Sequence, residues 1–180
     1  MADYLLSNYA VSMDEDAIDR VVASWHRERP DLDLAAVGLL GRFGRLAVIA
    51  GRRVEEVFPR HGLRSGEFDV LATLRRSGQP YALTPSAMSA TLMLSRAGMT
   101  NRIDRLEEAG MVERQLDPAD RRSFLIALTQ VGRETVDAAM TEHTANETRL
   151  VSSLTHTERQ TLDTLLRKLL QSLDDEPLDH

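Results

Sequence analysis

The chain has 180 residues and a mass of 20.1 kDa, which suits one domain with extensions. Hydrophobic residues make up 42% of it and charged residues 28%, a balance that excludes disorder over most of the chain. The absence of cysteine excludes disulfides, thiolate metal sites and thiol-oxidation switches. The net charge of −6 excludes a uniformly basic nucleic-acid-binding protein, so any case for DNA binding rests on local charge and motif.

Charge is distributed unevenly along the sequence. Of the 22 basic residues, 21 are arginine, whose planar guanidinium group suits phosphates, carboxylates and base edges. Residues 34–64 carry 6 basic and 2 acidic residues, whereas both ends of the chain are acidic. No basic segment followed by an apolar run opens the chain, and the longest uncharged stretch, 77–95, contains two prolines. We therefore expect a soluble cytoplasmic protein that spans no membrane.

Capping signals and helical periodicity define the predicted elements of the first half. After a loose arm of about a dozen residues, Ser12 and Glu15 have the spacing of a capping box, and Trp25 closes the apolar stripe that follows. Ser65 and Ser95 are predicted to cap two later helices, and Thr84-Pro85 opens a short one. The predicted helices cover about 13–28, 33–58, 65–77, 85–91 and 95–109.

The second half predicts a hairpin followed by two helices. Two strand-like runs, 111–116 and 123–128, flank a polar loop, and helices are predicted at about 129–152 and 155–173. Two short helices joined by a tight turn and followed at once by a hairpin form a winged helix. The fold class is therefore mainly α with a small β-hairpin wing: a winged helix-turn-helix with a helical dimerisation region.

Here the sequence resembles a known family. The run from Ser95 to Gly110, SRAGMTNRIDRLEEAG, is similar to the recognition helix of the MarR family of bacterial regulators. The run DPADRRS at 117–123 resembles that family's wing, and Leu128-Thr129 with Gly132-Arg133 resembles its return into the dimerisation helix. The resemblance covers about Val37 to Leu173. One departure is Ala119, where the family often has an arginine, so we do not expect the full ion-pair network of the family's wing.

The resemblance implies a homodimer that binds double-stranded DNA at a pseudo-palindromic operator, most simply as a repressor. It divides the chain into an arm and extra helix (1–33), a dimerisation helix (34–64), the winged helix-turn-helix DNA-binding region (65–128), and C-terminal dimerisation helices with an acidic tail (129–180). The leucine stripe at 162–170 suits a dimer interface, although it also suits packing within one chain.

The implied DNA contacts come from the recognition helix and the wing. Arg96 is the candidate for a bidentate contact to guanine, Ser95 and Thr100 suit phosphates, and Arg122 is favoured for the minor groove. Ser95 also reads as a helix cap, and Met99 suits the core as well as a thymine methyl group. The predicted DNA-binding residues are Ser95, Arg96, Met99, Thr100, Asn101, Arg105, Arg121 and Arg122.

The extra N-terminal helix resembles the family subgroup that responds to urate or to trans-aconitate. That subgroup's tryptophan, aspartate and two arginines match Trp25, Asp69, Arg102 and Arg114. A guanidinium group binds an anion and an indole supports a planar ring. We expect Asp69 to pair with Arg102 until a small anionic ligand competes for the arginine. In the alternative interpretation, Trp25 anchors the extra helix, Asp69–Arg102 is a static ion pair, and Arg114 is a surface charge.

Other function classes find less support. The five histidines are scattered, and no nucleophile elbow, P-loop or dinucleotide fingerprint is present, so we predict no catalytic residue, cofactor or metal. The same DNA-binding regulator with a different effector, or none, stays open. A helical protein-interaction module without DNA binding explains the acidic ends but not the wing. For a regulator, we expect a cytoplasmic protein associated with the nucleoid.

Overall fold

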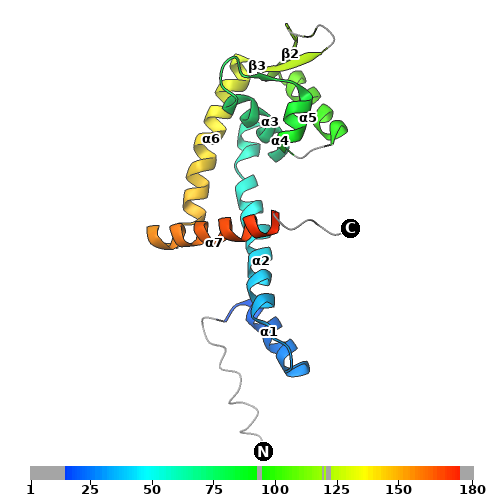
Figure 1. Cartoon of the computed structure of the whole chain (residues 1–180). Helices are drawn as coiled ribbons and strands as arrows, with labels where there is room; N and C mark the ends of the chain where they lie inside the picture. Colours follow the sequence, from blue (N-terminus) through cyan, green and yellow to red (C-terminus); the bar gives the residue numbers. More distant parts are fainter. Residues whose placement is uncertain (1–14, 93–94, 119, 121–122, 175–180) are drawn as a thin grey trace, which may run out of the picture. The chain divides into compact units, whose positions relative to one another are not determined.

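The computed structural model describes residues 15–92, 95–118, 120 and 123–174. The chain divides into two units, one ending at Arg52 and the other beginning at Arg53. Figure 1 traces the elements of both units in chain order.

In the first unit, α1 (Ala17–Glu28) packs against the long helix α2 (Ala35–Glu55). Glycines on α2 allow the close approach, because a Cβ atom on Gly41 would lie 3.2 Å from Cγ2 of Ile18 and one on Gly38 would lie 3.5 Å from Cγ2 of Val22. Arg42 joins the two helices by pairing with Asp16 at 2.8 Å and also with Asp19. The extra helix is therefore held by both shape and charge.

The prediction for the start of α1 is wrong. The helix begins at Ala17 rather than near residue 13, and Ser12 lies outside the described residues. Its N-cap is Asp16, whose carboxylate accepts hydrogen bonds from the N–H groups of Ile18 and Asp19, while Asp19 completes a capping box. The Asp19 backbone N–H and the Arg42 side chain lower the pKa of Asp16 to about 2.

The second unit is built on one hydrophobic core. It contains the 3₁₀ turn η1 (Phe58–His61), α3 (Ser65–Arg76), α4 (Pro85–Leu92) and α5 (Arg96–Glu108), followed by the wing strands β2 (Val112–Leu116) and β3 (Phe124–Leu128). Helices α6 (Gln130–Leu150) and α7 (His156–Asp174) complete it. The largest fully buried side chains are Leu71, Leu74, Met88, Met99, Ile103, Leu106 and Ile126.

Most predicted helix caps are confirmed. The hydroxyl groups of Thr84, Ser95 and Thr129 each accept a backbone N–H three residues later, at 3.2, 3.2 and 3.0 Å. Thr155 and Glu158 form the predicted capping box. Gly110 has φ +69°, the left-handed conformation that ends α5.

Other boundaries need correction. Helix α2 ends at Glu55, and residues up to Phe58 that were predicted as helix form a turn and the start of η1. The N-cap of α3 is Arg64 rather than Ser65, because the Glu67 carboxylate accepts the Arg64 N–H at 2.9 Å. A third strand, β1 (Ala82–Leu83), was not predicted, because two residues are too few to show periodicity. It pairs with β3, which gives the antiparallel order β1-β3-β2.

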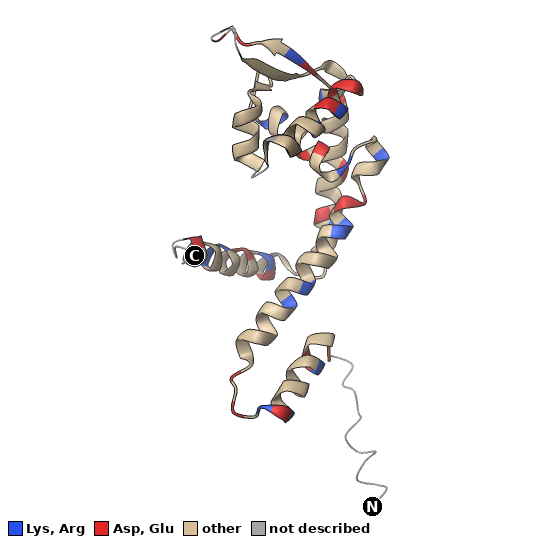
Figure 2. Cartoon of the chain, turned by 90° about the vertical axis from the view of Figure 1, so that its right-hand side faces the viewer, with Lys and Arg blue, Asp and Glu red and all other residues tan. Residues whose placement is uncertain are grey.

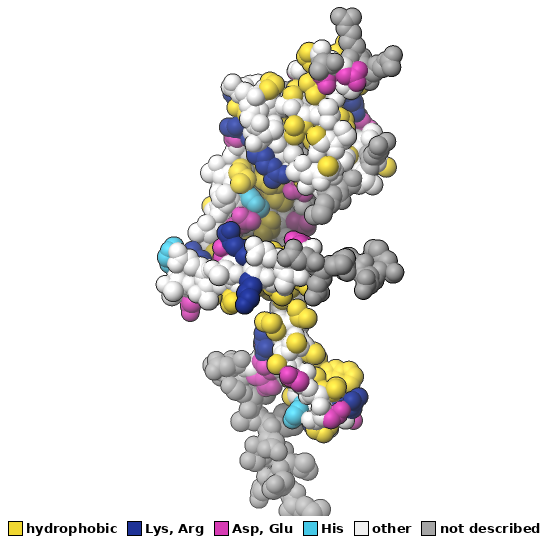
Figure 3. All heavy atoms as spheres, in the orientation of Figure 1, with side chains coloured by type: hydrophobic (Ala, Val, Ile, Leu, Met, Phe, Trp, Pro, Cys, Tyr) yellow, Lys and Arg dark blue, Asp and Glu magenta, His cyan; other side chains and the backbone are white. Residues whose placement is uncertain are grey.

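Two helices expose large apolar side chains. No residue of α7 is buried, and Leu165, Leu170 and Leu173 are each more than half exposed. In the first unit, Leu39, Leu40 and Leu46 of α2 are also more than half exposed. Figure 3 shows hydrophobic side chains at the surface of α1 and α2. Several large apolar side chains exposed along one helix are typical of a protein–protein interface. None of the described helices is both long enough and apolar enough to cross a membrane.

We predict that acid will loosen α1 from α2. A carboxyl group whose pKa is depressed stabilises the fold above its ordinary pKa of 3.8, and this contribution is lost as the pH falls through about 2. Fluorescence of Trp25, the only tryptophan, should therefore change between about pH 4 and pH 2. Asp16→Ala should flatten this titration, while Asp31→Ala, which removes a carboxylate that pairs with neighbouring Arg29, should keep it. Identical curves for wild type and Asp16→Ala would contradict the prediction.

Candidate nucleic-acid interface

Helix α5 has one face in the core and one face in solvent. Met99, Ile103 and Leu106 are each no more than 2% exposed and fix the helix against the core. Thr100 and Asn101 are exposed, and so is Ser95, which caps the helix. The first two turns of α5 thus present small polar groups outward, the arrangement by which a recognition helix reaches DNA.

The predicted DNA-binding residues have different outcomes. Met99 is 1% exposed and its side chain fills the core beneath α5, so of its two predicted roles, core residue or contact with a thymine methyl group, the structure favours the core. The capping role of Ser95 is confirmed by the Gly98 N–H, while its contact with phosphate stays a prediction. Arg121, Arg122 and the side chain of Arg96 lie outside the described part of the structure.

Arg105 joins α5 to α3. Its Nε atom donates a hydrogen bond to Oε1 of Glu67 at 2.6 Å, and Glu67 is only 6% exposed. Burial alone raises the pKa of Glu67, but hydrogen bonds from Arg105 and from the Arg64 backbone outweigh burial and keep it below its usual value. One edge of the Arg105 guanidinium is therefore committed within the protein, and its contact with DNA stays a prediction.

Arg114 joins the wing to α5. From β2 it forms ion pairs with Asp104 and Glu107, which lie on the same helix one turn apart. The sequence suggested either a ligand contact or a surface charge for Arg114, and neither interpretation included this pairing. Because one guanidinium group bridges two carboxylates, the strand and the recognition helix are held in a defined relation.

Arg102 lies against α3 at a position without a side chain. A Cβ atom placed on Gly66 would fall 2.3 Å from Nε and 2.4 Å from Cζ of Arg102, so the guanidinium group lies directly on Gly66. Among the described residues, Arg102 and Asp69 do not form the ion pair that the sequence predicted. The charge of Arg102 still lowers the pKa of Asp69, although burial outweighs it and the net shift is upward.

The four predicted ligand residues are brought together only in part. Asp69 and Arg102 lie within electrostatic range, whereas Arg114 contacts Asp104 and Glu107. Trp25 belongs to the first unit, and its side chain is 52% exposed, so it does not anchor α1 in a core. The common pocket therefore stays a prediction.

The distribution of charged side chains and of metal-ligating residues indicates which ligands the winged helix can bind. Figure 2 shows basic and acidic residues interspersed along its described elements. Across the described ranges, no group of three or more His, Cys, Asp or Glu side chains is placed to hold a metal ion. The features that bear on recognition are thus the polar face of α5 and the contacts that hold it.

Sequence comparison reveals related regulators. A family model described as the MarR family matches residues 61–123. The HTH-type transcriptional regulator PecS of Dickeya dadantii (strain 3937) is 37% identical over 156 residues, covering 87% of this chain and 94% of PecS. Such similarity extends well beyond the winged helix.

Solved structures show the same fold. A mutant MarR from E. coli complexed with operator DNA has a TM-score of 0.65 and 27% identity, covering 76% of this chain and 97% of that one. CouR from Rhodococcus jostii RHA1 bound to p-coumaroyl-CoA has a TM-score of 0.61 and 28% identity, covering 81% and 96%. The predicted fold class is confirmed. Because the matches are to transcriptional regulators, the prediction that the chain is not an enzyme is also confirmed.

We predict that Gly66→Ala will displace the guanidinium group of Arg102 while α3 stays helical, since alanine favours a helix more than glycine does. Arg102 lowers the pKa of Asp69, so moving it away should raise that pKa further, as measured by NMR titration. The same substitution in an Arg102→Ala background should add no shift, and Ser65→Ala is the control in the same turn. Equal shifts of the Asp69 pKa in both backgrounds would show that Gly66 acts by another route.

Proposed function

This chain belongs to the MarR family, and we propose that it binds a pseudo-palindromic operator in double-stranded DNA as a homodimeric repressor. The observation that carries the proposal is the pairing of Arg114 with Asp104 and Glu107, which joins the wing to α5. A recognition helix and a wing in fixed relation meet a major groove and the neighbouring minor groove with less loss of conformational entropy on binding. The operator-bound MarR structure supports the same use of this fold.

In this proposal the N-terminal half of α5 enters the major groove. Ser95, Thr100 and Asn101 are exposed there, and Arg96, the first residue of the helix, is the candidate for guanine recognition. Arg121 and Arg122 follow in the sequence of the wing and suit the minor groove. Arg105 contributes to DNA only through the edge of its guanidinium group that Glu67 leaves open.

The exposed apolar surfaces of α2 and α7 support a dimer. Each Leu side chain transferred from water into an interface contributes about 1.5–3 kcal/mol, and α7 has no buried residue within the described chain. A two-fold dimer places its two recognition helices in half-sites about 10 base pairs apart, centre to centre.

We propose that a small anion, such as urate or trans-aconitate, releases the DNA. Arg102 lies on the recognition helix, its guanidinium group rests on Gly66 of α3, and its charge acts on Asp69, so an anion can draw the guanidinium group away while repelling Asp69. At Arg114 an anion competes with Asp104 and Glu107, and so loosens the wing from α5. The indole of Trp25 supplies a surface for a planar ligand. CouR bound to p-coumaroyl-CoA is a relative that holds a small molecule.

The first test is fluorescence anisotropy on the DNA upstream of the chain's own gene, with urate and trans-aconitate added separately. We expect tight binding that weakens steeply with salt, because phosphate contacts release counterions, and that one anion relieves. Arg102→Ala should bind DNA with a blunted response to the anion, and Arg20→Ala, on exposed α1 surface, should respond as the wild type does. Tight DNA binding that neither anion weakens would contradict the proposed effector but not the DNA-binding function. Absence of binding to any duplex would contradict the DNA-binding function and favour a protein-interaction module.

A second prediction concerns the dimer. Light scattering should give about 40 kDa, twice the 20.1 kDa of one chain. Replacing Leu165 and Leu169 together by Glu places two charges on the apolar face of α7 and should give a monomer with much weaker operator binding. Val131→Glu, which alters an exposed apolar residue of α6, is the matched control and should stay dimeric. A Leu165→Glu/Leu169→Glu protein of dimer mass would exclude α7 from the interface.

A further inference from the structure

Two large apolar side chains are exposed at the outer end of the wing. Leu116, the last residue of β2, is 63% exposed, and Phe124, the first residue of β3, is 50% exposed. They are register partners, so they lie directly opposite each other where the strands end and the loop 117–123 begins. The Asp117 N–H donates to the Ser123 carbonyl at 3.1 Å and closes this loop. Leu116 and Phe124 are called the wing pair below.

The wing pair lies on the face of the wing that is turned towards the core and α5. Successive residues of a strand alternate between its two faces, so the wing pair shares a face with Arg114 of β2 and Ile126 of β3. Arg114 pairs with Asp104 and Glu107 of α5. Ile126 is 1% exposed and belongs to the core. The wing pair therefore continues this inner face outward by about 7 Å, to a place where the core no longer covers it.

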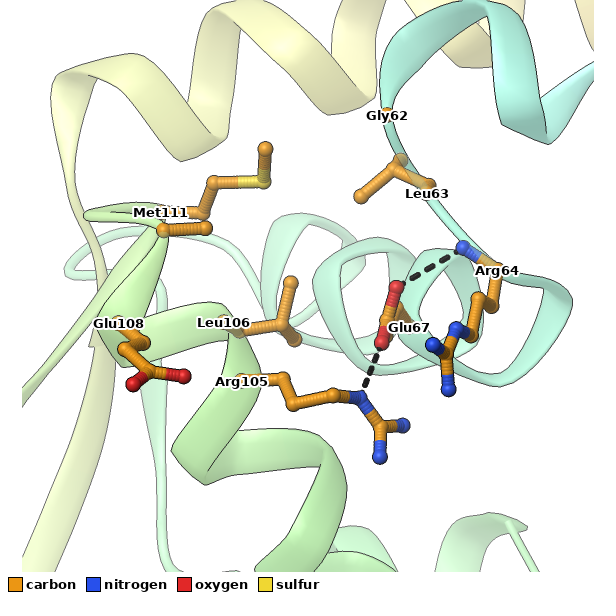
Figure 4. A pocket seen from close by; sticks show the side chains of 9 residues that line it. Gly62, Leu63, Arg64, Glu67, Arg105, Leu106, Glu108 and Met111 are labelled. Carbon is orange, nitrogen blue, oxygen red and sulfur yellow. Dashed lines mark hydrogen bonds and ion pairs between the residues drawn. The ribbon is translucent and has the colours of Figure 1, made fainter.

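The position of the inner face relative to the recognition helix is fixed by ion pairs. Arg114 joins the wing to α5. Arg105 in turn joins α5 to α3, because its Nε atom donates to the buried Glu67 carboxylate at 2.6 Å, a hydrogen bond that Figure 4 shows. The exposed polar face of α5 is the surface that suits the major groove. The wing pair is therefore continuous with the candidate nucleic-acid interface.

The charges around the wing pair are compatible with DNA. Within β2 and β3, both of which the structure describes in full, the inner face carries no Asp or Glu, and Glu113 lies on the opposite face. In the sequence, Arg121 and Arg122 balance Asp117 and Asp120 in the loop between the strands. Phosphates beside the inner face therefore meet no like charge from the strands. Deoxyribose rings next to those phosphates present C–H groups, which suit an apolar surface.

We propose that the wing pair packs against deoxyribose rings at the edge of the minor groove and supplies an apolar part of the operator affinity. This rests on the operator binding proposed above and adds to it a contact that involves no charge. Apolar side chains are a recurrent means of binding the minor groove. Transfer of the wing pair from water onto the sugars removes apolar surface without releasing counterions. Its contribution is therefore insensitive to salt, unlike that of the phosphate contacts.

The test compares the full chain with a Leu116→Thr/Phe124→Thr double variant. Fluorescence anisotropy measures binding to the DNA upstream of the chain's own gene over a series of salt concentrations. Threonine keeps the strand propensity of both positions and removes apolar surface. We expect the double variant to bind about 10-fold more weakly at every salt concentration, with an unchanged slope of log affinity against log salt. Arg122→Ala, which removes a charge, should instead make that slope shallower.

Controls separate the loss of apolar surface from other effects. Phe124→Leu keeps a large apolar side chain and should retain most of the affinity. Val131→Thr changes an exposed apolar residue of α6, away from the wing, and should bind as the wild type does. The melting temperature of the double variant should equal that of the wild type, because both side chains of the wing pair are exposed in the chain itself.

The outcomes distinguish this contact from the proposed function. If the wild type binds DNA and the double variant binds equally well at every salt concentration, the contact is overturned and the proposed function stands. Absence of binding by the wild type to any duplex would overturn both. A shallower salt slope for the double variant would attribute its loss of affinity to displaced charges. A change in its mass by light scattering would assign the wing pair to association between copies of the chain. Either of these two results would overturn the proposal.

Discussion

The position of α5 is the constraint on which the rest of the molecule depends. The buried side chains of Met99, Ile103 and Leu106 fix its inner face against the core. On each of its two flanks, an arginine forms ion pairs that join the helix to a neighbouring element. On one flank Arg105 pairs with buried Glu67 of α3, and on the other Arg114 of the wing pairs with Asp104 and Glu107. The hydrophobic contacts fix how closely α5 packs on the core, while the ion pairs fix its position relative to α3 and the wing.

The ion pairs on the two flanks of α5 differ in the free energy that is needed to break them. Removing Arg105, whose own side chain is 40% exposed, leaves the 8% exposed carboxylate of Glu67 without its charged partner, and a buried carboxylate that loses its partner costs more than a broken exposed pair. The Arg114 pairs are more exposed, and exposed pairs contribute about 1 kcal/mol or less each. The α3–α5 junction is therefore the firm side of the recognition helix, and the junction with the wing is the side that a modest interaction energy can shift.

The local structure was predictable because its signals are local. Thr84, Ser95, Thr129 and the Thr155–Glu158 box each act within one helical turn, so sequence spacing alone located them. Two misses are also local, since Asp16 caps α1 in place of Ser12 through a box with Asp19, and Arg64 caps α3 through Glu67. The other misses depend on residues far apart in the chain. The Glu67–Arg105 and Arg102–Gly66 contacts join two helices, and no periodicity reports such a pairing.

The arginines at 102 and 105 are three residues apart on α5 and meet consecutive residues of α3, Gly66 and Glu67. One contact is a guanidinium group on bare backbone, and the other is an ion pair with a buried carboxylate. An anion can take the first arginine without leaving a buried charge behind, whereas taking the second would strand Glu67. A ligand that moves the helix is therefore expected to act at Arg102 rather than at Arg105. Of these two arginine contacts with α3, the one on Gly66 can be displaced without stranding a buried charge, and the one with Glu67 cannot.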